Sequence, residues 1–345
     1  MGISGFPETR GFIEGKDEIM KAINWNNSDN QIAKVFWKQN INQFWTEEAF
    51  KVSRDLSDWG SMSEDEQNTY VEVLSGLTGL DREQGDNGMP LIAIHHDNMH
   101  EQAVFSWMGM MEHIHAKSYS HIFSTLIPSR KTNYYLGEWV DKQPELQEKY
   151  RLISYWYHQL YDKRENVTPF KRYMAMTASV FLESFSFYSG FFYPVFLSGQ
   201  GRMIASGEII RKIIQDESIH GSFTGMVAQR LYRDNLNDEE KETADHRLYE
   251  LLDQLVEVEK RYTTKVYTKI NLVKEVNDYV LYNANRALQN LGREDRYEHD
   301  PVSQIVLNGI DTGTINHDFF STKGDYVVPL NIEPLTDEDF IFDNV

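Results

Sequence analysis

The chain has 345 residues, of which 41% are hydrophobic and 13% aromatic, so it can bury a large core and is not intrinsically disordered. Its formal net charge of -19 argues against nucleic-acid backbones and anionic membranes as partners, because both would repel it. The absence of cysteine excludes disulfides, thiolate metal sites and cysteine nucleophiles, and it is compatible with a cytoplasmic protein.

Helical periodicity dominates the sequence and predicts a mainly α fold. The expected helices cover residues 28–57, 64–86, 99–127, 134–162, 168–198, 207–233, 237–267 and 270–292. We expect Pro128 to stop the third helix, Pro194 to bend the fifth and Ser206 to cap the sixth. The amino terminus lacks an apolar signal core and no stretch approaches about 18 uninterrupted apolar residues, so no membrane span is expected.

The last part of the chain differs in composition from the rest. Residues 311–345 mix Gly, Asp, Thr and Pro and end in an acidic stretch that contains Phe340 and Phe342. This pattern predicts a flexible tail with a short docking segment, after a folded domain that covers residues 1–310.

Four of the expected helices carry charged residues on the stripe that should face the core. Asp81, for example, follows Leu74 by seven residues and Leu77 by four, which places all three on one helix face. The six residues of this kind are Asp81, Glu112, His115, Glu183, Glu217 and His220. Buried carboxylates cost several kcal/mol unless they are paired or bound to metal, so the set needs a compensating positive charge.

Two of these helices carry Glu-x-x-His, which places both side chains on one face within reach of one ion. Such a pair is weak evidence alone, but four-helix bundles that bind two metal ions combine two of these pairs with one carboxylate from each of two other helices. The order of the six residues matches that arrangement. Carboxylate oxygens with one imidazole per ion favour iron or manganese over zinc. The sequence therefore predicts a ferritin-like helical bundle with a dimetal-carboxylate site in its core.

Tyr119 lies one helical turn beyond His115 on the same face, where an oxidising metal cluster could convert its phenol to a radical. Phe187, Phe191 and Ile213 lie one or two turns from ligands on facing helices and would keep that radical dry. Without the ligands nearby, Tyr119 would be interpreted as an ordinary core tyrosine, and the other three pack in the core on either interpretation.

Simpler interpretations exist for Asp81 and for the remaining histidines. Asp81 could be a solvated charge at a helix end, although its spacing from the leucines argues against this. A further set of histidines is expected at the surface or around the ligands, without metal: His95, His96, His100, His113 and His121.

These motifs resemble the small, radical-generating subunit of class I ribonucleotide reductase, and class Ib most of all. The resemblance runs from Trp25 to the tail and is most specific in GLTGLD, MEHIHAKSYSHIFSTL, LESFSFYSGF and IIQDESIHG. It implies that the six residues above bind two manganese or two iron ions, and that Tyr119 carries the radical. It also implies that Trp45, Asp216 and Tyr326 transfer the radical, with Asp216 hydrogen-bonded to a metal-binding histidine.

Partners follow from the same resemblance. Reduction of ribonucleotides in this family uses cysteine chemistry that this chain lacks, so a large catalytic subunit is required. The tail is expected to dock on that subunit, a flavodoxin-like protein is expected to act as activator, and the usual state is a homodimer. Two other functions use the same ligands: a ferritin-like dimetal oxidase acting on a small organic substrate, and a metal-binding or storage bundle.

Overall fold

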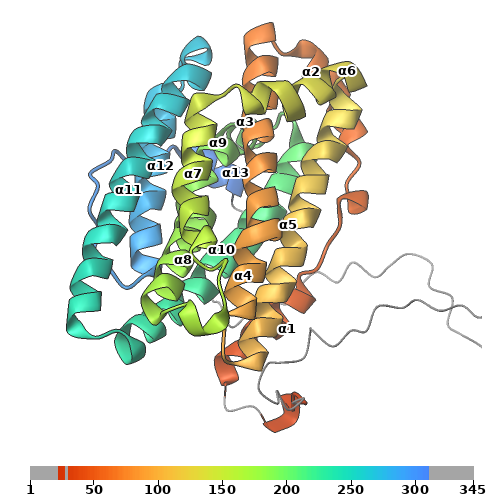
Figure 1. Ribbon diagram of the computed structural model, residues 1–345. Coiled ribbons are helices and arrows are strands. Elements are labelled where there is room, and N and C mark those ends of the chain that lie inside the picture. The colour runs from red at the N-terminus through yellow and green to blue at the C-terminus, as the bar shows by residue number, and fades with distance from the viewer. Residues whose placement is uncertain (1–21, 28–29, 311–345) are drawn as a thin grey trace, which may run out of the picture.

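The computed structural model describes residues 22–27 and 30–310, and within these ranges every regular element is helical. Long helices run side by side in an elongated bundle (Figure 1). The bundle contains α3 (Glu64–Glu83), α5 (Met99–Leu126), α7 (Pro144–His158), α8 (Pro169–Phe181), α9 (Tyr188–Gly199), α10 (Ile204–Asn235), α11 (Asp238–Tyr267) and α12 (Val273–Asn290). The shorter helices are α1 (Gln31–Asn42), α2 (Leu56–Ser61), α4 (Met89–Ile94), α6 (Ser129–Asn133) and α13 (Gln304–Ile310). The predicted mainly α bundle is confirmed.

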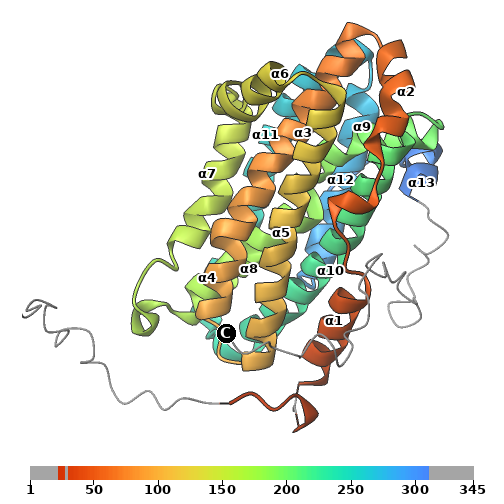
Figure 2. The same cartoon turned by 90° about the vertical axis from the view of Figure 1, so that its right-hand side faces the viewer.

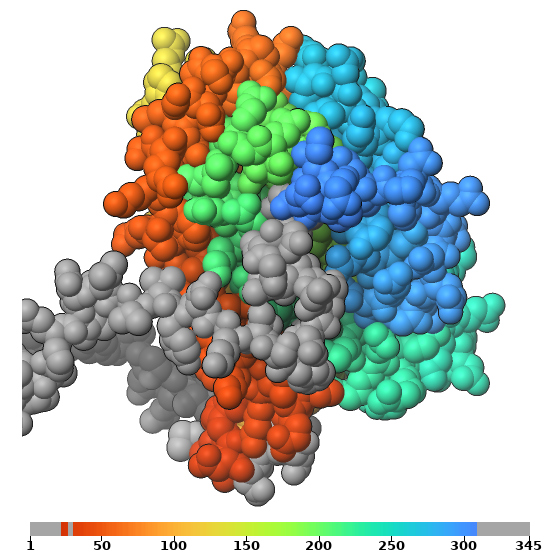
Figure 3. Space-filling view, turned by 180° about the vertical axis from the view of Figure 1, so that it is seen from behind, coloured from red at the N-terminus to blue at the C-terminus, as the bar shows by residue number. Residues whose placement is uncertain are grey.

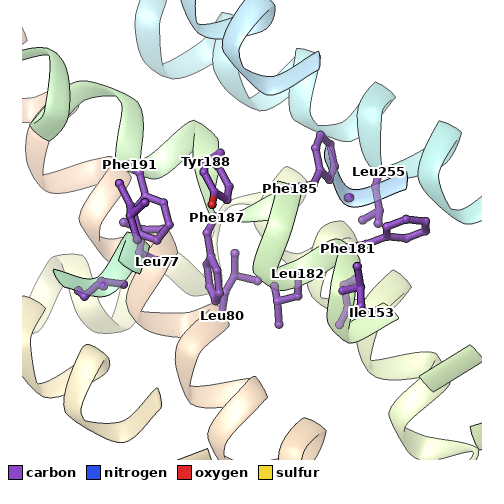
Figure 4. Packing of buried hydrophobic residues seen from close by; sticks show 14 of the residues in the cluster. Leu77, Leu80, Ile153, Phe181, Leu182, Phe185, Phe187, Tyr188, Phe191 and Leu255 are labelled. Atoms are coloured by element: carbon purple, nitrogen blue, oxygen red, sulfur yellow. The ribbon is translucent and has the colours of Figure 1, made fainter. Parts of the chain in front are cut away.

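The centre of the bundle is built around α9, which contacts both α3 and α10. α3 packs against α5 and α9, and α10 packs against α8 and α9, while α7, α11 and α12 cover one side of this arrangement (Figures 1 and 2). Figure 4 shows apolar side chains from α3 and from the α8–α9 region filling the space between them, with Phe187 beside Leu80 and Phe191 beside Leu77. The approach of α9 to α3 is close, because a Cβ atom at Gly190 would lie 2.6 Å from Cγ of Leu77.

The segment from Pro169 to Gly199 is long and apolar enough to cross a membrane by length and composition, but 94% of its apolar window is buried inside the bundle. This is the behaviour of the central helix of a folded core. It is the single stretch of this kind in the described part of the chain.

The expected helix at 28–57 is broken in the structure. α1 ends at Asn42, and the chain continues through the short turns η2 (Glu47–Ala49) and η3 (Val52–Asp55) into α2. The expected helix at 134–162 is also divided, because α7 begins only at Pro144. At the second break Pro144 stands at the start of the helix, where its fixed φ and missing N–H favour a new helix.

The start of α10 corrects the prediction for Ser206. The helix begins at Ile204, so Ser206 lies inside its first turn and is not the N-cap. The carboxylate of Asp55 takes the capping role from a distant segment, accepting the backbone N–H groups of Ala205 at 2.9 Å and Ser206 at 2.7 Å. An acceptor so far away in the sequence is not visible to a local capping rule.

Two turns of π-helix adjoin the expected ligands. The first, η4 (Gln84–Gly88), continues α3 just after Asp81, and the second, η7 (Leu182–Ser186), joins α8 to α9 and contains Glu183. Wide turns of this kind are rare and occur mostly at functional sites.

On the face shown in Figure 3, α13 lies against α9. A Cβ atom at Gly199 would lie 2.0 Å from the carbonyl oxygen of Ile305, so this contact requires glycine. The predicted tail, with Tyr326, Phe340 and Phe342, lies outside the described residues.

Candidate metal centre

The six predicted ligands are all fully buried and lie together in two groups that share two glutamates. The first group is Asp81, Glu112, His115 and Glu217, and the second is Glu112, Glu183, Glu217 and His220. Within each group, one ligand atom of every residue lies within 4.8 Å of the others. Glu112 and Glu217 are the two residues common to both groups.

The distances between ligand atoms suit metal coordination. Nδ1 of His115 lies 2.9 Å from Oε1 of Glu217 and 3.4 Å from Oδ1 of Asp81. Nδ1 of His220 lies 2.8 Å from Oε1 of Glu112 and 3.6 Å from Oε2 of Glu183. Donors about 2.1 Å from one ion in octahedral geometry are about 3 Å apart, so these separations fit ligands that converge on a shared cation.

Each ligand comes from a helix of the bundle. Asp81 is on α3, Glu183 is in η7, and the two Glu-x-x-His pairs are on α5 and α10. Because the spacing of three residues keeps each pair on one helix face, the two histidines meet across the centre with ring centroids 6.0 Å apart.

The hydrogen bonding of the ligands tests whether metal ions fit. Both carboxylate oxygens of Asp81, Glu112 and Glu217, and Nδ1 of His115 and of His220, are buried and have no hydrogen-bond partner in the described part of the chain other than one another. So many unsatisfied oxygens and imidazole nitrogens facing one space are very costly in a protein core unless a cation binds them. The donor set, with hard oxygens and one imidazole per group, suits manganese or iron.

Burial and contacts within the cluster shift the pKa values of the ligands. Burial raises the pKa of Asp81 and of Glu183 well above the usual range for a carboxyl group. Burial would lower the pKa of His115, but Asp216 and the surrounding carboxylates raise it well above its ordinary value. Burial would also raise the pKa of Glu217, but hydrogen bonds with Glu183, His115 and His220 outweigh it and lower that pKa.

Asp216 connects His115 to Trp45. Oδ2 of Asp216 lies 3.0 Å from Nε2 of His115 and accepts the indole N–H of Trp45 at 2.7 Å, while Oδ1 accepts the Gln43 amide at 2.6 Å. The rings of Trp45 and His115 are stacked, with centroids 5.9 Å apart. Trp45 is 1% exposed, so this chain of contacts lies inside the protein. In contrast, Nε2 of His220 has no hydrogen-bond partner among the described residues.

Tyr119 is fully buried on α5, and its hydroxyl has no hydrogen-bond partner among the described residues. Burial raises the pKa of its phenol well above the ordinary value, and the charges of Asp81, Glu217 and Glu112 raise it further. The three predicted neighbours, Phe187, Phe191 and Ile213, are all fully buried, and the rings of the two phenylalanines lie 5.7 Å apart. The phenol therefore lies in a dry interior and retains its proton.

The sequence reasoning missed the residues that hold Glu183. The amide of Gln84, in η4, donates to Oε1 of Glu183 and, at 2.8 Å, to Ser179, and its carbonyl oxygen accepts the hydroxyl of Tyr157. Gln84 and its three partners are all buried. Gln84 follows Asp81 by three residues, and this spacing was the available signal, because it places an amide on the ligand face.

Two of the histidines expected around the site or at the surface are deeply buried. His95 is 6% exposed and His96 is 5% exposed, and neither belongs to a metal-ligand group in the described part of the chain. His96 pairs with Glu101. The carboxylate of Glu101 also accepts bidentate hydrogen bonds from the guanidinium group of Arg230, at 2.7 Å from Nη1 and 2.5 Å from Nη2. This cluster ties α5 to α10 away from the predicted ligands.

Comparisons with known proteins decide the family. Residues 22–304 match the family described as ribonucleotide reductase, small chain. The chain belongs to this family. It is 45% identical over 326 residues to the ribonucleoside-diphosphate reductase subunit beta of Bacillus phage SPbeta, covering 94% of this chain and 97% of the relative. It is 43% identical over 328 residues to the subunit of the same name from Bacillus subtilis strain 168, covering 95% and 98%.

A solved structure agrees. The dimanganese(II)-NrdF of Streptococcus sanguinis superposes with a TM-score of 0.79 at 37% identity, covering 85% of this chain and all of the other. The predicted family, the class Ib likeness and the ferritin-like fold are thus confirmed. As a ribonucleotide reductase small subunit, the chain has the radical-generating role, and the oxidase and storage alternatives are not favoured.

Proposed function

We propose that this subunit binds two manganese or two iron ions, stores one oxidising equivalent as a radical on Tyr119, and passes it to a large subunit that reduces ribonucleotides. The observation that carries the proposal is the pair of ligand groups that share Glu112 and Glu217. Asp81 and His115 would complete one ion's ligands, and Glu183 and His220 the other's. When bound and activated by dioxygen, superoxide or peroxide, the two ions supply the oxidising power that the radical requires.

Tyr119 would lose one electron and one proton to become a neutral radical. Its raised pKa supports this, because the phenol keeps its proton until it is oxidised, and the oxidised phenol is a strong acid that then releases that proton. The buried Phe187, Phe191 and Ile213 would exclude water and reductants from the radical. The residues of the chain thus position the phenol and protect it.

The route out of the subunit would pass through His115, Asp216 and Trp45. The support is the unbroken series of contacts, 3.0 Å from His115 to Asp216 and 2.7 Å from Asp216 to Trp45. Asp216 would orient the imidazole and accept the indole N–H, which lowers the cost of oxidising the indole. Tyr326, in the tail, would take the radical across the subunit boundary.

Three protein contacts complete the proposal. The chain would form a homodimer in the cytoplasm, residues 311–345 would dock on the large subunit through the segment of Phe340 and Phe342, and a flavodoxin-like protein would activate a manganese form. The acidic, Phe-containing end of the sequence supports the docking role.

The test is reduction of a ribonucleoside diphosphate by the reconstituted enzyme. Wild-type protein with its large subunit should turn over, whereas Tyr119→Phe should bind both ions and lose activity at least 1000-fold. A chain that ends at Ile310 should keep the metal and the radical but lose turnover. Activity in either variant at the wild-type rate would contradict the corresponding assignment.

A further inference from the structure

Lys149 and Glu259 form a buried ion pair outside the predicted metal ligands. Lys149, on α7, is 1% exposed, and its ammonium group contacts the carboxylate of Glu259 on α11, which is 0% exposed. The ammonium group also lies 5.0 Å from the ring centroid of Tyr262. Lysine and glutamate are almost never buried this fully, and an apolar pair of similar volume is often as stable or more so. Stability alone therefore does not explain this pair.

The third contact of Lys149 leads to the metal centre. Its Nζ donates to the backbone carbonyl of Ser186 at 3.3 Å. Ser186 is the last residue of η7, the wide turn that contains Glu183. In this turn the N–H of Phe187 bonds to the carbonyl of Leu182, five residues back, at 3.4 Å. Lys149 therefore reaches the backbone of the segment whose side chain enters the second ligand group.

The width of this turn determines where Glu183 points. A π turn contains one residue more than an α turn, and a change to α geometry rotates the neighbouring side chains by about 100° around the helix axis. The two sides of the turn are held separately: Gln84 holds the carboxylate of Glu183, and Lys149 holds the carbonyl of Ser186. Glu259 in turn contacts the ammonium group of Lys149 inside the core.

We propose that Lys149 and Glu259 are a positioning pair that maintains the π-helical turn of η7. In this way the pair would place the carboxylate of Glu183 beside His220, in the second group of metal ligands. The inference rests on the proposed function for the two-ion site but not for the radical. The pair itself would not contact the ions. Loss of the pair should weaken the group with Glu183 and His220 and leave the group with Asp81 and His115 intact.

The experiment measures manganese(II) binding to full-length Lys149→Met/Glu259→Met, in which both charges are removed together. We expect a folded protein in which one ion binds as in the wild type and the other at least tenfold more weakly. Anomalous diffraction at the manganese edge from crystals of the variant should locate the retained ion beside Asp81 and His115. A merely structural role would weaken both ions equally or neither, and either result would overturn the proposal.

One control pair and two further variants of the buried pair complete this test. Arg261→Met/Glu148→Met removes an exposed ion pair of 2.8 Å that joins the same two helices, and it should leave both affinities unchanged. Glu259→Gln removes only the carboxylate that holds the ammonium group of Lys149, and the ion beside Glu183 should bind more weakly while the ion beside Asp81 is retained. If the Met pair does not fold, Lys149→Gln/Glu259→Gln supplies a second uncharged background, since glutamine is too short to reach Ser186, and the same selective loss is expected. Wild-type protein that binds fewer than two ions would instead contradict the proposed function, whatever the variants do.

Discussion

Trp45 donates its indole N–H to Oδ2 of Asp216 at 2.7 Å, deep inside the protein. The same oxygen lies 3.0 Å from Nε2 of His115, a predicted metal ligand. One carboxylate oxygen therefore contacts both a predicted ligand and a tryptophan in the segment that follows α1.

Trp45→Phe should separate radical storage from radical transfer. Phenylalanine fills most of the space but offers no N–H to Asp216 and is much harder to oxidise than an indole. We expect two bound ions, a detectable Tyr119 radical and at least a 100-fold loss of turnover with the large subunit. Trp139→Phe, at another buried tryptophan, is the matched control and should retain activity. Wild-type turnover in Trp45→Phe would exclude this route.

The two shared glutamates should matter more for metal binding than the unshared ones. Glu112→Ala or Glu217→Ala removes a ligand from both groups, whereas Glu183→Ala removes one from the second group only. We expect manganese per chain to fall from two to below one in the first two variants and to about one in the third. Metal analysis after desalting measures this, and equal losses in all three would contradict the assignment of Glu112 and Glu217 as shared ligands.

Metal loading should also stabilise the fold, because it neutralises buried carboxylates. A ligand that binds only the folded state contributes about 2.7 kcal/mol per site at a free concentration of about 100 times Kd. The melting temperature of the wild type should therefore rise with manganese, and that of a Glu112→Ala/Glu217→Ala variant should not. Calorimetry with and without metal compares the two.

The buried cluster of His96, Glu101 and Arg230 predicts that the stability of the protein depends on pH. Burial would raise the pKa of Glu101, but the hydrogen bonds with His96 and Arg230 outweigh it and lower the pKa to about 2. Since the folded pKa lies below the unfolded value of about 4.3, the stabilisation is fully present above that value and is lost as pH falls toward 2. The shift corresponds to roughly 3 kcal/mol at neutral pH.

Urea unfolding of wild type and Glu101→Gln at several pH values tests this prediction. The difference in free energy of unfolding should be largest at pH 6 and about 1 kcal/mol smaller by pH 3.5. Glu239→Gln changes an exposed glutamate in the first turn of α11 and should show no such trend. A constant difference for Glu101→Gln would contradict the ion-pair interpretation.

Gly190→Ala should destabilise the contact between α9 and α3. The new Cβ would lie 2.6 Å from Cγ of Leu77, and overpacking of this kind costs typically about 1–3 kcal/mol. Leu77→Ala in the same chain opens the space, so the double variant should be more stable than the sum of the single costs predicts. Gly60→Ala, which meets nothing within 4 Å, is the control. Additive costs would mean that the two residues do not compete for the same space.

Much of the site could be predicted from sequence because helical spacing is local. Asp81 and the two Glu-x-x-His pairs repeat with the period of a helix, and each falls on a buried face in the structure. The ends of α5 and α11 also lie within a residue of their expected positions. The features that could not be predicted, such as the N-cap of α10, depend on residues far away in the sequence. Asp55 caps α10 in place of Ser206, and nothing near position 206 signals this.

The wide turns were missed for a related reason. The residues of η7 read as uninterrupted helix, and the choice between α and π geometry depends on partners far along the chain, such as Gln84 and Lys149. His96 was expected at the surface or around the ligands, whereas it is buried and pairs with Glu101, which also accepts from Arg230. Its partner lies in the first turn of α5, and the histidine alone gives no sign of it.

The most direct test of the radical on Tyr119 is a low-temperature electron paramagnetic resonance spectrum of protein loaded with iron(II) and exposed to air, recorded beside Tyr119→Phe. The account predicts a tyrosyl signal with hyperfine structure and fast relaxation in the wild type, and no such signal in the variant, although both hold two ions per chain. An unchanged radical in Tyr119→Phe would contradict it.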